Sequence, residues 1–283
     1  MSDFVRQNAV VTDFATSDSW VILSPIEQSI KRKIEAVGVP LKDWDIQINY
    51  GIKTGYNEAF IITTEKRDEI LSNCADDDER RRTDELIRPI LRGRDIKRYG
   101  YEWADLWLIN SHNGIKGKLE RIHIEDYPAV KAHLDRYWDK ISTRADKGDT
   151  PYNLRNCAYL DDFSKPKIVW GNLNLNGSYS RVPEGVFINA PSPFIATSNI
   201  SVLHFLNSKL ADYYIRSLGV TRNGGYFEYK PMFVDKCPIP QTGLDELYRY
   251  PEKPTMEQEE EINQYLFKLL ELTRNEIEFI ENQ

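Results

Sequence analysis

Two short strand-like runs flank a glycine-containing segment near residue 50, and this arrangement constrains the fold more than any other feature of the chain. Residues 46–50 and 59–63 are rich in β-branched and aromatic side chains, as strands are. The segment between them, residues 51–60, holds two glycines, a lysine, a threonine and an asparagine. These residue types predict a hairpin or tight loop with exposed donors at its tip. A phosphate-binding loop is excluded, because Lys53-Thr54 precedes the second glycine and a strand is predicted to follow.

The length and the residue types of the chain set its broad class. The 283 residues are enough for one large or two modest domains with a buried core. No apolar run reaches the roughly 18–20 residues of a membrane span, and a signal sequence is missing from the N-terminus, which predicts a cytoplasmic protein. The cysteines form no Cys-x-x-Cys pair and the histidines no His-x-x-x-His pair. The sequence therefore predicts neither a disulfide framework nor a metal site.

The net charge of −7 is unevenly distributed, and this changes what it implies about partners. Residues 244–283 hold eleven acidic and four basic residues, whereas the other 243 residues hold 33 of each. Residues 80–98 carry eight basic side chains against three acidic ones. A basic segment in a neutral body can bind the phosphates of DNA, although on charge alone a solvated helix face is the slightly better interpretation.

Helical and strand patterns are mixed along the chain, which predicts an α+β fold with a sheet-rich body, several packed helices and a C-terminal helix. Helices are predicted where apolar residues recur every three to four positions, and strands where short apolar runs occur. The predicted helices span residues 25–37, 65–72, 83–91, 127–144, 201–218 and 256–280, with a charged loop over 74–82. The predicted strands beyond residue 63 span 106–109, 167–171 and 186–189, with an amide-rich turn over 172–178.

The segment 91–99 carries the side chains that best suit contacts with nucleic acid. Its basic residues surround a glycine and are followed by a tyrosine; they are Arg92, Arg94, Lys97 and Arg98. Guanidinium groups supply forked donors that match phosphates or guanine edges. We expect these four side chains to contact phosphates or base edges.

A second segment with suitable chemistry spans residues 221–230. It combines Arg222, Asn223 and Tyr226 with two glycines. Such a mixture suits insertion into a groove or stacking on a displaced base. An ordinary surface loop is the alternative interpretation.

Six short motifs occur in an order that is more specific than any one of them. They are GIKTGYNEAF (51–60), ILRGRDIKRY (90–99), YPAVKAHL (127–134), KPKIVW (165–170), LHFLNSKL (203–210) and KCPIP (236–240). In this order, over roughly residues 40–241, the chain resembles the TaqI-like C-terminal specificity domain. That domain is the target-recognition part of N6-adenine DNA methyltransferases and of single-chain type IIG restriction-modification enzymes.

The resemblance implies a mixed α+β module that grips duplex DNA opposite a methyltransferase domain and selects its sequence. It implies that residues 1–40 form a junction from the methyltransferase domain, that 41–243 form the target-recognition domain, and that 244–283 form an acidic helical segment. Candidate contacts with the DNA backbone or with the catalytic domain then extend to Lys53, Thr54 and Asn57.

Motifs for catalysis do not accompany these features. An N6-adenine methyltransferase needs an Asn/Asp-Pro-Pro-Tyr/Phe motif to hold the flipped adenine, and the sequence has no Pro-Pro pair. A glycine-rich fingerprint for S-adenosylmethionine and a metal-binding Asp…Glu-x-Lys nuclease pattern are also missing. We therefore expect DNA recognition without catalysis by this chain alone, as a separate subunit, a remnant or a piece of a longer protein. The expected partners are duplex DNA and a methyltransferase or endonuclease domain, with S-adenosylmethionine bound in that partner.

Two other functions remain as alternatives. The acidic C-terminal segment has an apolar stripe, which suggests a protein-interaction or assembly module of a phage-defence complex with weak DNA contact. The stripe consists of Ile262, Leu266, Leu269 and Ile277. If these side chains pack on the protein's own core, this alternative loses its main support. A hydrolase has little support, because no Gly-x-Ser-x-Gly motif and no nucleophile with an evident base are present.

Overall fold

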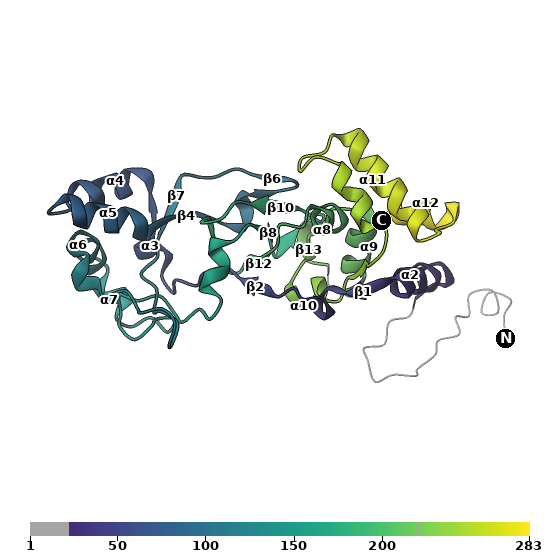
Figure 1. Cartoon of the computed structure of the whole chain (residues 1–283). Helices are drawn as coiled ribbons and strands as arrows, with labels where there is room; N and C mark the ends of the chain where they lie inside the picture. The colour runs from purple at the N-terminus through teal and green to yellow at the C-terminus, as the bar shows by residue number, and fades with distance from the viewer. Residues whose placement is uncertain (1–22, 220) are drawn as a thin grey trace, which may run out of the picture.

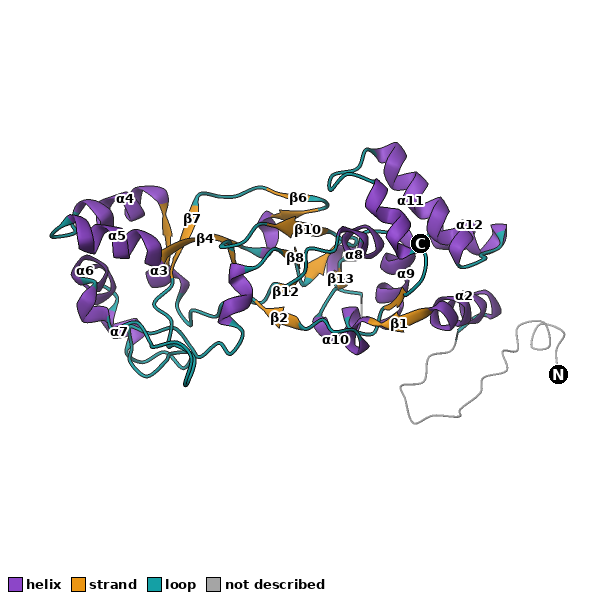
Figure 2. Ribbon diagram, in the orientation of Figure 1, coloured by secondary structure: helices purple, strands orange, loops and turns teal. Residues whose placement is uncertain are grey.

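Two hydrophobic cores lie next to each other along an elongated molecule (Figure 1). The computed structural model describes residues 23–219 and 221–283, so the first 22 residues of the predicted junction lie outside the described residues. We name the cores after a fully buried aromatic residue in each, the Phe163 core and the Trp170 core. Helices and mixed sheets contribute to both, which confirms the predicted α+β class (Figure 2).

The helices gather at the two ends of the molecule (Figure 1). At the end of the Phe163 core lie α3 (Asn57–Phe60), α4 (Thr64–Ser72), α5 (Asp77–Leu86), α6 (Pro128–Asp135) and α7 (Trp138–Ile141). At the end of the Trp170 core lie α2 (Pro25–Val37), α8 (Ile200–Leu206), α9 (Lys209–Leu218), α10 (Pro231–Val234), α11 (Met256–Leu269) and α12 (Arg274–Glu281). Short 3-10 turns are η1 (Leu41–Asp43), η2 (Gly93–Asp95), η3 (Ile124–Asp126), η4 (Leu160–Ser164), η5 (Asn223–Gly225) and η6 (Leu244–Arg249).

The described strands form two four-stranded sheets and three two-stranded ribbons. The central sheet has the order β10 (Tyr179–Val182), β8 (Lys167–Trp170), β12 (Pro193–Ile195), β2 (Ile48–Tyr50). The outer sheet has the order β11 (Phe187–Ile188), β4 (Ile87–Leu91), β7 (Leu106–Ile109), β3 (Ile61–Thr63). The ribbons pair β1 (Gly38–Pro40) with β14 (Pro238–Pro240), β13 (Phe227–Glu228) with β9 (Leu173–Asn174), and β5 (Ile96–Lys97) with β6 (Gly100–Tyr101).

The central sheet separates the two cores and contributes side chains to both. In β8, Ile168 and Trp170 belong to the Trp170 core, whereas Val169 between them belongs to the Phe163 core. In β12, Ile195 belongs to the Trp170 core and Phe194 belongs to the Phe163 core. Successive side chains of a strand point to opposite faces, so a continuous apolar run is what a sheet buried on both faces requires.

The prediction of a hairpin around residues 51–60 is wrong. β2 pairs with β12 in the central sheet, whereas β3 pairs with β7 in the outer sheet. The chain between them crosses from one sheet to the other, with Ile52 in a parallel bridge to Asn189 and α3 formed just before β3. Each strand has a better partner elsewhere in the sequence, and these long-range pairings override the local turn signal.

Residues 74–91 also differ from their prediction. A charged loop was predicted over 74–82 and a helix over 83–91. Instead, helix α5 covers most of the predicted loop and the start of the predicted helix, and its N-cap Asp76 accepts a hydrogen bond from the Glu79 backbone. The stretch predicted as the rest of that helix is strand β4. Pro89 lies in β4 without breaking it, because β4 pairs with β7 up to Pro89 and with β11 only from Ile90 onward.

Each of the three long predicted helices is divided into two. Residues 127–144 form α6 and α7, residues 201–218 form α8 and α9, and residues 256–280 form α11 and α12. At the second break, Asn207 bonds both backbone groups of Tyr179 in the central sheet, and Ser208 caps α9. Polar side chains that bond the backbone favour helix ends over helix interiors, so they decide where these helices stop.

Other predictions are confirmed. Helix α2 begins with a capping box between Ser24 and Glu27, with Pro25 in its first turn and Gly38 as C-cap. Helix α4 and strands β7, β8 and β11 occur where they were expected. Helices in the described part of the chain are all too short or too polar to cross a membrane.

Lys167 is fully buried in β8, and we expect it to make the stability of the protein depend on pH. Its Nζ donates to the carbonyls of Phe163, Pro183 and Val186, and burial lowers the pKa of this lysine to about 8. Because the unfolded state holds the proton more tightly, stability rises with pH from about 8 to the ordinary lysine pKa. Between pH 7 and pH 9.5 the wild type should gain about 2 kcal/mol over Lys167→Met in urea unfolding.

The neighbouring Lys165 provides the control for this measurement. It is exposed and pairs with Asp162, which raises the pKa of Lys165 above its ordinary value. Lys165 stays protonated in both states over this range, so Lys165→Met should show a pH-independent difference from wild type. Equal pH dependence in the two comparisons would contradict the assignment to Lys167.

Candidate nucleic-acid interface

Glycines bring the backbones of several segments together where the two cores meet. A Cβ on Gly51 would lie 2.4 Å from the carbonyl oxygen of Ile188, and one on Gly93 would lie 2.7 Å from Ser192 Oγ. A Cβ on Gly171 would in turn lie 3.4 Å from the carbonyl oxygen of Gly93. Backbone atoms exclude a Cβ at Gly51, whereas a Cβ at Gly93 or Gly171 would require a neighbouring side chain to shift. The segment 188–192 therefore lies against both the crossing segment (residues 51–60) and η2, and η2 lies against Gly171.

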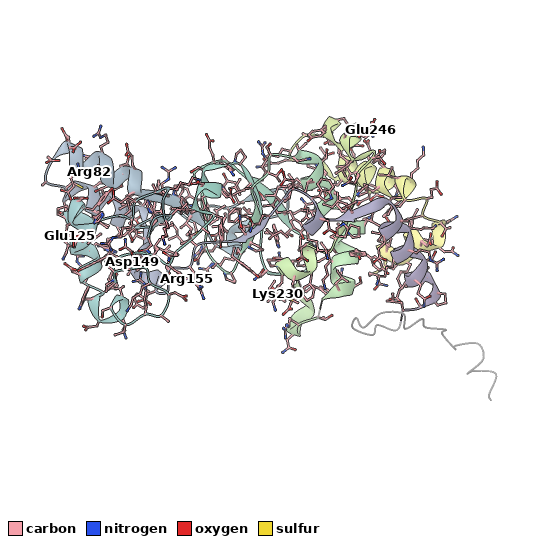
Figure 3. All side chains as sticks on the ribbon, turned by 60° about the horizontal axis from the view of Figure 1, so that its bottom comes forward. Arg82, Glu125, Asp149, Arg155, Lys230 and Glu246 are labelled. Atoms are coloured by element: carbon pink, nitrogen blue, oxygen red, sulfur yellow. The ribbon has the colours of Figure 1, made fainter. Side chains whose placement is uncertain are left out.

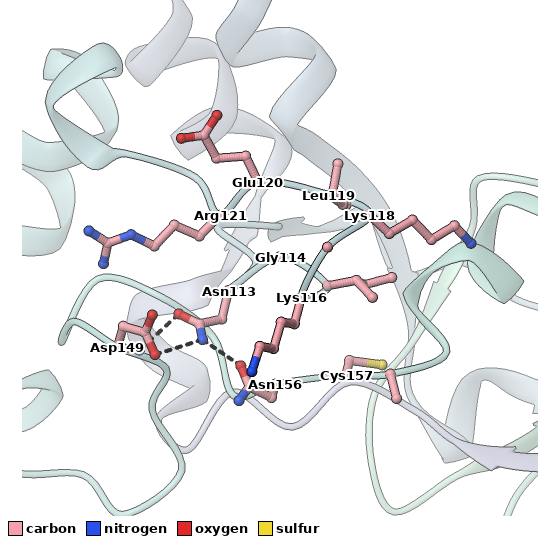
Figure 4. A pocket seen from close by; sticks show the side chains of 13 residues that line it. Asn113, Gly114, Lys116, Lys118, Leu119, Glu120, Arg121, Asp149, Asn156 and Cys157 are labelled. Carbon is pink, nitrogen blue, oxygen red and sulfur yellow. Dashed lines mark hydrogen bonds between the residues drawn. The ribbon is translucent and has the colours of Figure 1, made fainter.

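A cavity of about 820 Å³ opens between the loop 113–121 and the loop that follows α7 (Figure 4). Residues 115–119 form a small turn closed by backbone hydrogen bonds between Ile115 and Leu119, with Gly117 at positive φ. The turn exposes Lys116 and Lys118 on either side of this glycine. We call this space the loop cavity; its lining includes basic side chains of the loop 113–121 and the amides of Asn113 and Asn156.

A second cavity, of about 510 Å³, adjoins the loop cavity at the crossing segment. The two share Asn156, Cys157 and Ala158, so they lie next to each other along this stretch of the chain. We call the second one the crossing cavity; it is lined by Tyr50, Gly51, Ile52, Lys53, Arg155, Tyr159, Ala190 and Pro191 besides the shared residues. Gly51, Ile52 and Lys53 of the glycine-containing segment 51–60 therefore form one wall of a surface depression.

Asp146 joins two exposed cations at the edge of the crossing cavity. Its carboxylate lies 3.0 Å from Lys53 Nζ and 3.0 Å from Arg155 Nη1. The hydrogen bond from Lys53, with the charge of Arg155 as a smaller cause, holds the pKa of Asp146 below its ordinary value. The three groups carry a net positive charge on residues from two distant parts of the chain.

Arg144 fixes the backbone that carries these groups. Its guanidinium is buried over the ring of Phe60 and donates to the carbonyl oxygens of Ile141, Asp146, Pro151 and Asn153. Burial lowers the pKa of Arg144 to about 10. One side chain thus holds most of the loop between α7 and Arg155 in shape.

A third cavity, of about 580 Å³, lies beside the β9–β13 ribbon. Arg222 and Lys230 both pair with the carboxylate of Glu228 there, which lowers the pKa of Glu228. Asn223 and Tyr226 are exposed on the same loop. Lys230 lies along the same side of the molecule as Arg155 and Asp149 (Figure 3).

The predicted contact residues differ in their availability. Arg94 is exposed, and its guanidinium makes no hydrogen bond or ion pair with another described side chain. Lys97 is exposed and donates to the Arg94 carbonyl. The guanidinium of Arg92 donates two hydrogen bonds to Asp95, and these bonds are the main reason that the pKa of Arg92 is raised. Arg98 is bound to Glu259, so the residues predicted together in 91–99 do not act as one patch.

The residues predicted in the crossing segment are likewise divided. Lys53 and Asn57 are exposed, whereas Thr54 is 2% exposed and donates its hydroxyl to Asn57 Oδ1 at 2.6 Å. Thr54 therefore shapes the turn. The structure brings Lys53 together with Arg155, and Arg222 with Lys230.

The loop cavity was not predicted from the sequence. Its polar and basic lining side chains include Asn113, Lys116, Lys118, Arg121 and Asn156. The signals were the Asn-Gly at 113–114 and the Lys-Gly-Lys at 116–118, both turn patterns with exposed donors. Asn156 is bound to Asn113, 43 residues earlier in the chain, and local sequence does not show this pairing.

Comparison with known proteins identifies the family. A family model described as the TaqI-like C-terminal specificity domain matches residues 88–239, more than half of the 283 residues. The chain belongs to the TaqI-like C-terminal specificity domain family. The matched part of this specificity domain includes the loop cavity, η2 and the loop 221–230, which we call the Arg222 loop. No curated protein matches the chain.

Two solved structures share the fold of this specificity domain. One is the type IIL restriction-modification enzyme MmeI in complex with DNA, with a TM-score of 0.51 and 14% identity, covering 82% of this chain and 28% of MmeI. The other is the type IIG restriction endonuclease BpuSI, with a TM-score of 0.52 and 13% identity, covering 87% of this chain and 32% of BpuSI. The chain thus spans about a third of the length of these enzymes.

Proposed function

We propose that this chain recognises a specific sequence in duplex DNA as the specificity part of an N6-adenine DNA methyltransferase or type IIG restriction-modification enzyme. The observation that carries the proposal is membership of the specificity-domain family over residues 88–239. The fold shared with MmeI, whose structure was solved in complex with DNA, supports it. Arg155 and Lys230, which lie along one side of the molecule (Figure 3), supply positive charge of the kind that DNA binding requires.

The proposed contacts divide into two kinds. Cations contact phosphates and position the duplex; they are Lys53 and Arg155 at the crossing cavity, Lys230 at the third cavity and the exposed Arg94 of η2. Amide and aromatic groups contact bases, with Asn156 in the loop cavity and Asn223 and Tyr226 on the Arg222 loop. Residues of both kinds come from loops held by the two sheets.

We propose that the chain does not catalyse methylation or cleavage by itself. Its sequence has no Pro-Pro pair for a flipped adenine, and the chain spans only about a third of the length of two enzymes that share its fold. A separate domain or subunit then carries catalysis and binds S-adenosylmethionine. Among the described residues, no group of three or more His, Cys, Asp and Glu side chains is placed to hold a metal ion.

The assembly-module alternative loses its main support. Ile262 and Leu266 are fully buried in the Trp170 core, and Leu269 and Ile277 pack against it. The contacts that anchor the acidic segment are also internal, with Glu276 of α12 bound to Ser29 and Lys33 of α2. The apolar stripe is therefore used within the chain.

Salt titration tests the proposed function. Lys53→Gln with Arg155→Gln should weaken binding to all duplex sequences and reduce the slope of log K against log salt by about 1 to 2, because each phosphate contact releases about one counterion. Binding is measured by fluorescence anisotropy of labelled duplex pools from about 50 to 200 mM salt. Arg274→Gln, at an exposed residue of α12, is the control and should leave the slope unchanged. Salt-independent binding by wild type, or no binding even with the catalytic domain supplied, would refute DNA recognition.

A further inference from the structure

The amide of Asn113 is fixed by three hydrogen bonds. Its Oδ1 accepts the backbone N–H of Asp149 at 2.8 Å, so its Nδ2 must face the other way. That Nδ2 donates to the Asp149 carboxylate at 3.0 Å, which can only accept. The third hydrogen bond of Asn113 joins it to Asn156. The orientation of the Asn113 amide therefore follows from its partners, and Figure 4 shows the side chains of Asn113, Asp149 and Asn156 together.

The orientation of Asn113 determines that of Asn156. Asn113 Nδ2 also donates to Asn156, which must present its Oδ1 to receive this hydrogen bond. The Asn156 amide is exposed, and its Nδ2 is left to donate to a ligand. An exposed asparagine in a fixed orientation is a preorganised donor.

The acidic groups around the loop cavity are engaged with other partners. Asp149 is bound by Asn113, Asp161 pairs with Lys118, and Glu120 lies 3.1 Å from His123. In contrast, the side chains of Lys116 and Arg121 make no hydrogen bond or ion pair with other described residues, and both line the cavity. The donors of Asn156, Lys116 and Arg121 are therefore available to a ligand, and a ligand rich in acceptors would match them.

Two parts of duplex DNA are rich in acceptors, the phosphates and the major-groove edge of guanine. A phosphate needs only charge, which Lys116 supplies without a fixed amide. The guanine edge has the acceptors N7 and O6 side by side, which match two neighbouring donors. Adenine has an amino group where guanine has O6. An asparagine that is free to rotate binds adenine through both groups of its amide, because its oxygen accepts from this amino group and its nitrogen donates to N7. In Asn156 that oxygen is already engaged by Asn113.

We propose that Asn156, held by Asn113, reads a guanine in the major groove, with Asn156 Nδ2 donating to one acceptor and Lys116 to the other. The inference rests on the proposed function and specifies the base at one position of the target. Asn113 acts as a positioning residue. The exposed turn 116–118 is the part of the loop cavity that reaches the groove.

Selection of bound duplexes from a randomised pool, followed by sequencing, tests the inference. Wild type should enrich guanine at one position, and Asn156→Ala should reduce that preference about 10- to 100-fold while leaving the other positions and the salt slope unchanged. Lys116→Gln should reduce the guanine preference as well and lower the salt slope by less than one unit. Asn73→Ala, an exposed asparagine at the end of α4, is the matched control.

Asn113→Ala separates reading from a merely structural role. It frees the Asn156 amide to rotate, so adenine should become accepted at the position where wild type selects guanine, with the other positions unchanged. A wild type that selects a sequence while Asn156→Ala keeps every preference would overturn the inference and leave the proposed function standing. A wild type that selects no sequence would overturn both, and a uniform loss of affinity in Asn156→Ala would assign the residue to a phosphate.

Discussion

Replacing Gly51 by alanine should destabilise the protein by about 3 kcal/mol or more. The new Cβ would lie 2.4 Å from the carbonyl oxygen of Ile188 and 2.7 Å from the carbonyl carbon of Asn189, and both atoms belong to a backbone that cannot rotate away. Relieving the overlap would break the hydrogen bond from Ile52 N–H to the Ile188 carbonyl at 2.7 Å. Urea unfolding followed by tryptophan fluorescence measures the loss.

Gly100→Ala is the matched control for this substitution. A Cβ there meets only the end of the Lys253 side chain, at 3.8 Å, so the change in stability should stay within about 0.5 kcal/mol. If Gly51→Ala is as stable as Gly100→Ala, the close approach between the crossing segment and β11 is not tight.

Replacing Arg144 by methionine should cost about 3–5 kcal/mol, because four carbonyl oxygens, two of them in fully buried hydrogen bonds, lose the guanidinium that satisfies them. Methionine keeps the apolar contact with Phe60 but cannot donate a hydrogen bond. The loop that holds Arg155 and Asn156 should lose its fixed shape, so selection for the target sequence should weaken along with stability. Urea unfolding measures the first effect and pool selection the second.

Arg136→Met tests whether loss of any arginine near this loop has the same effect. Arg136 is exposed and makes a single surface ion pair with Glu69 at 3.4 Å. Its removal should change stability by less than about 1 kcal/mol and leave selection intact. Equal losses in the two variants would show that charge near the loop, and not the carbonyl network of Arg144, is responsible.

The elements predicted correctly are those with signals inside their own residues. Helix α2 has its capping box, proline and glycine within 15 residues, and β8 has the apolar run of a strand buried on both faces. Strand β4 was predicted as a helix because Leu86, Ile87, Ile90 and Leu91 fit a helical spacing equally well. Helix α5 was missed because its sequence is highly charged, and part of its support comes from Glu79, which accepts the backbone N–H of Ala129.

The candidate site could be predicted by residue type but not by arrangement. The basic side chains of 91–99 suit DNA, yet Arg98 is taken by Glu259, 161 positions later in the chain. The availability of a guanidinium depends on whether a carboxylate lies near it in the folded state, and local sequence does not show this. Lys53 is exposed, as the predicted donors at the tip of segment 51–60 imply, whereas its association with Arg155 through Asp146 required the fold.

The sheet shared by the two cores has a consequence for how target preference can change. A one-residue slip of β8 would exchange Val169 with its neighbours and disturb both cores at once, so the sheet tolerates little variation. Residues 116–120 and 155–156, in contrast, contribute no buried side chain to either core. Substitutions there can alter which DNA is bound at little cost in folding, which would let new specificities arise on a constant scaffold.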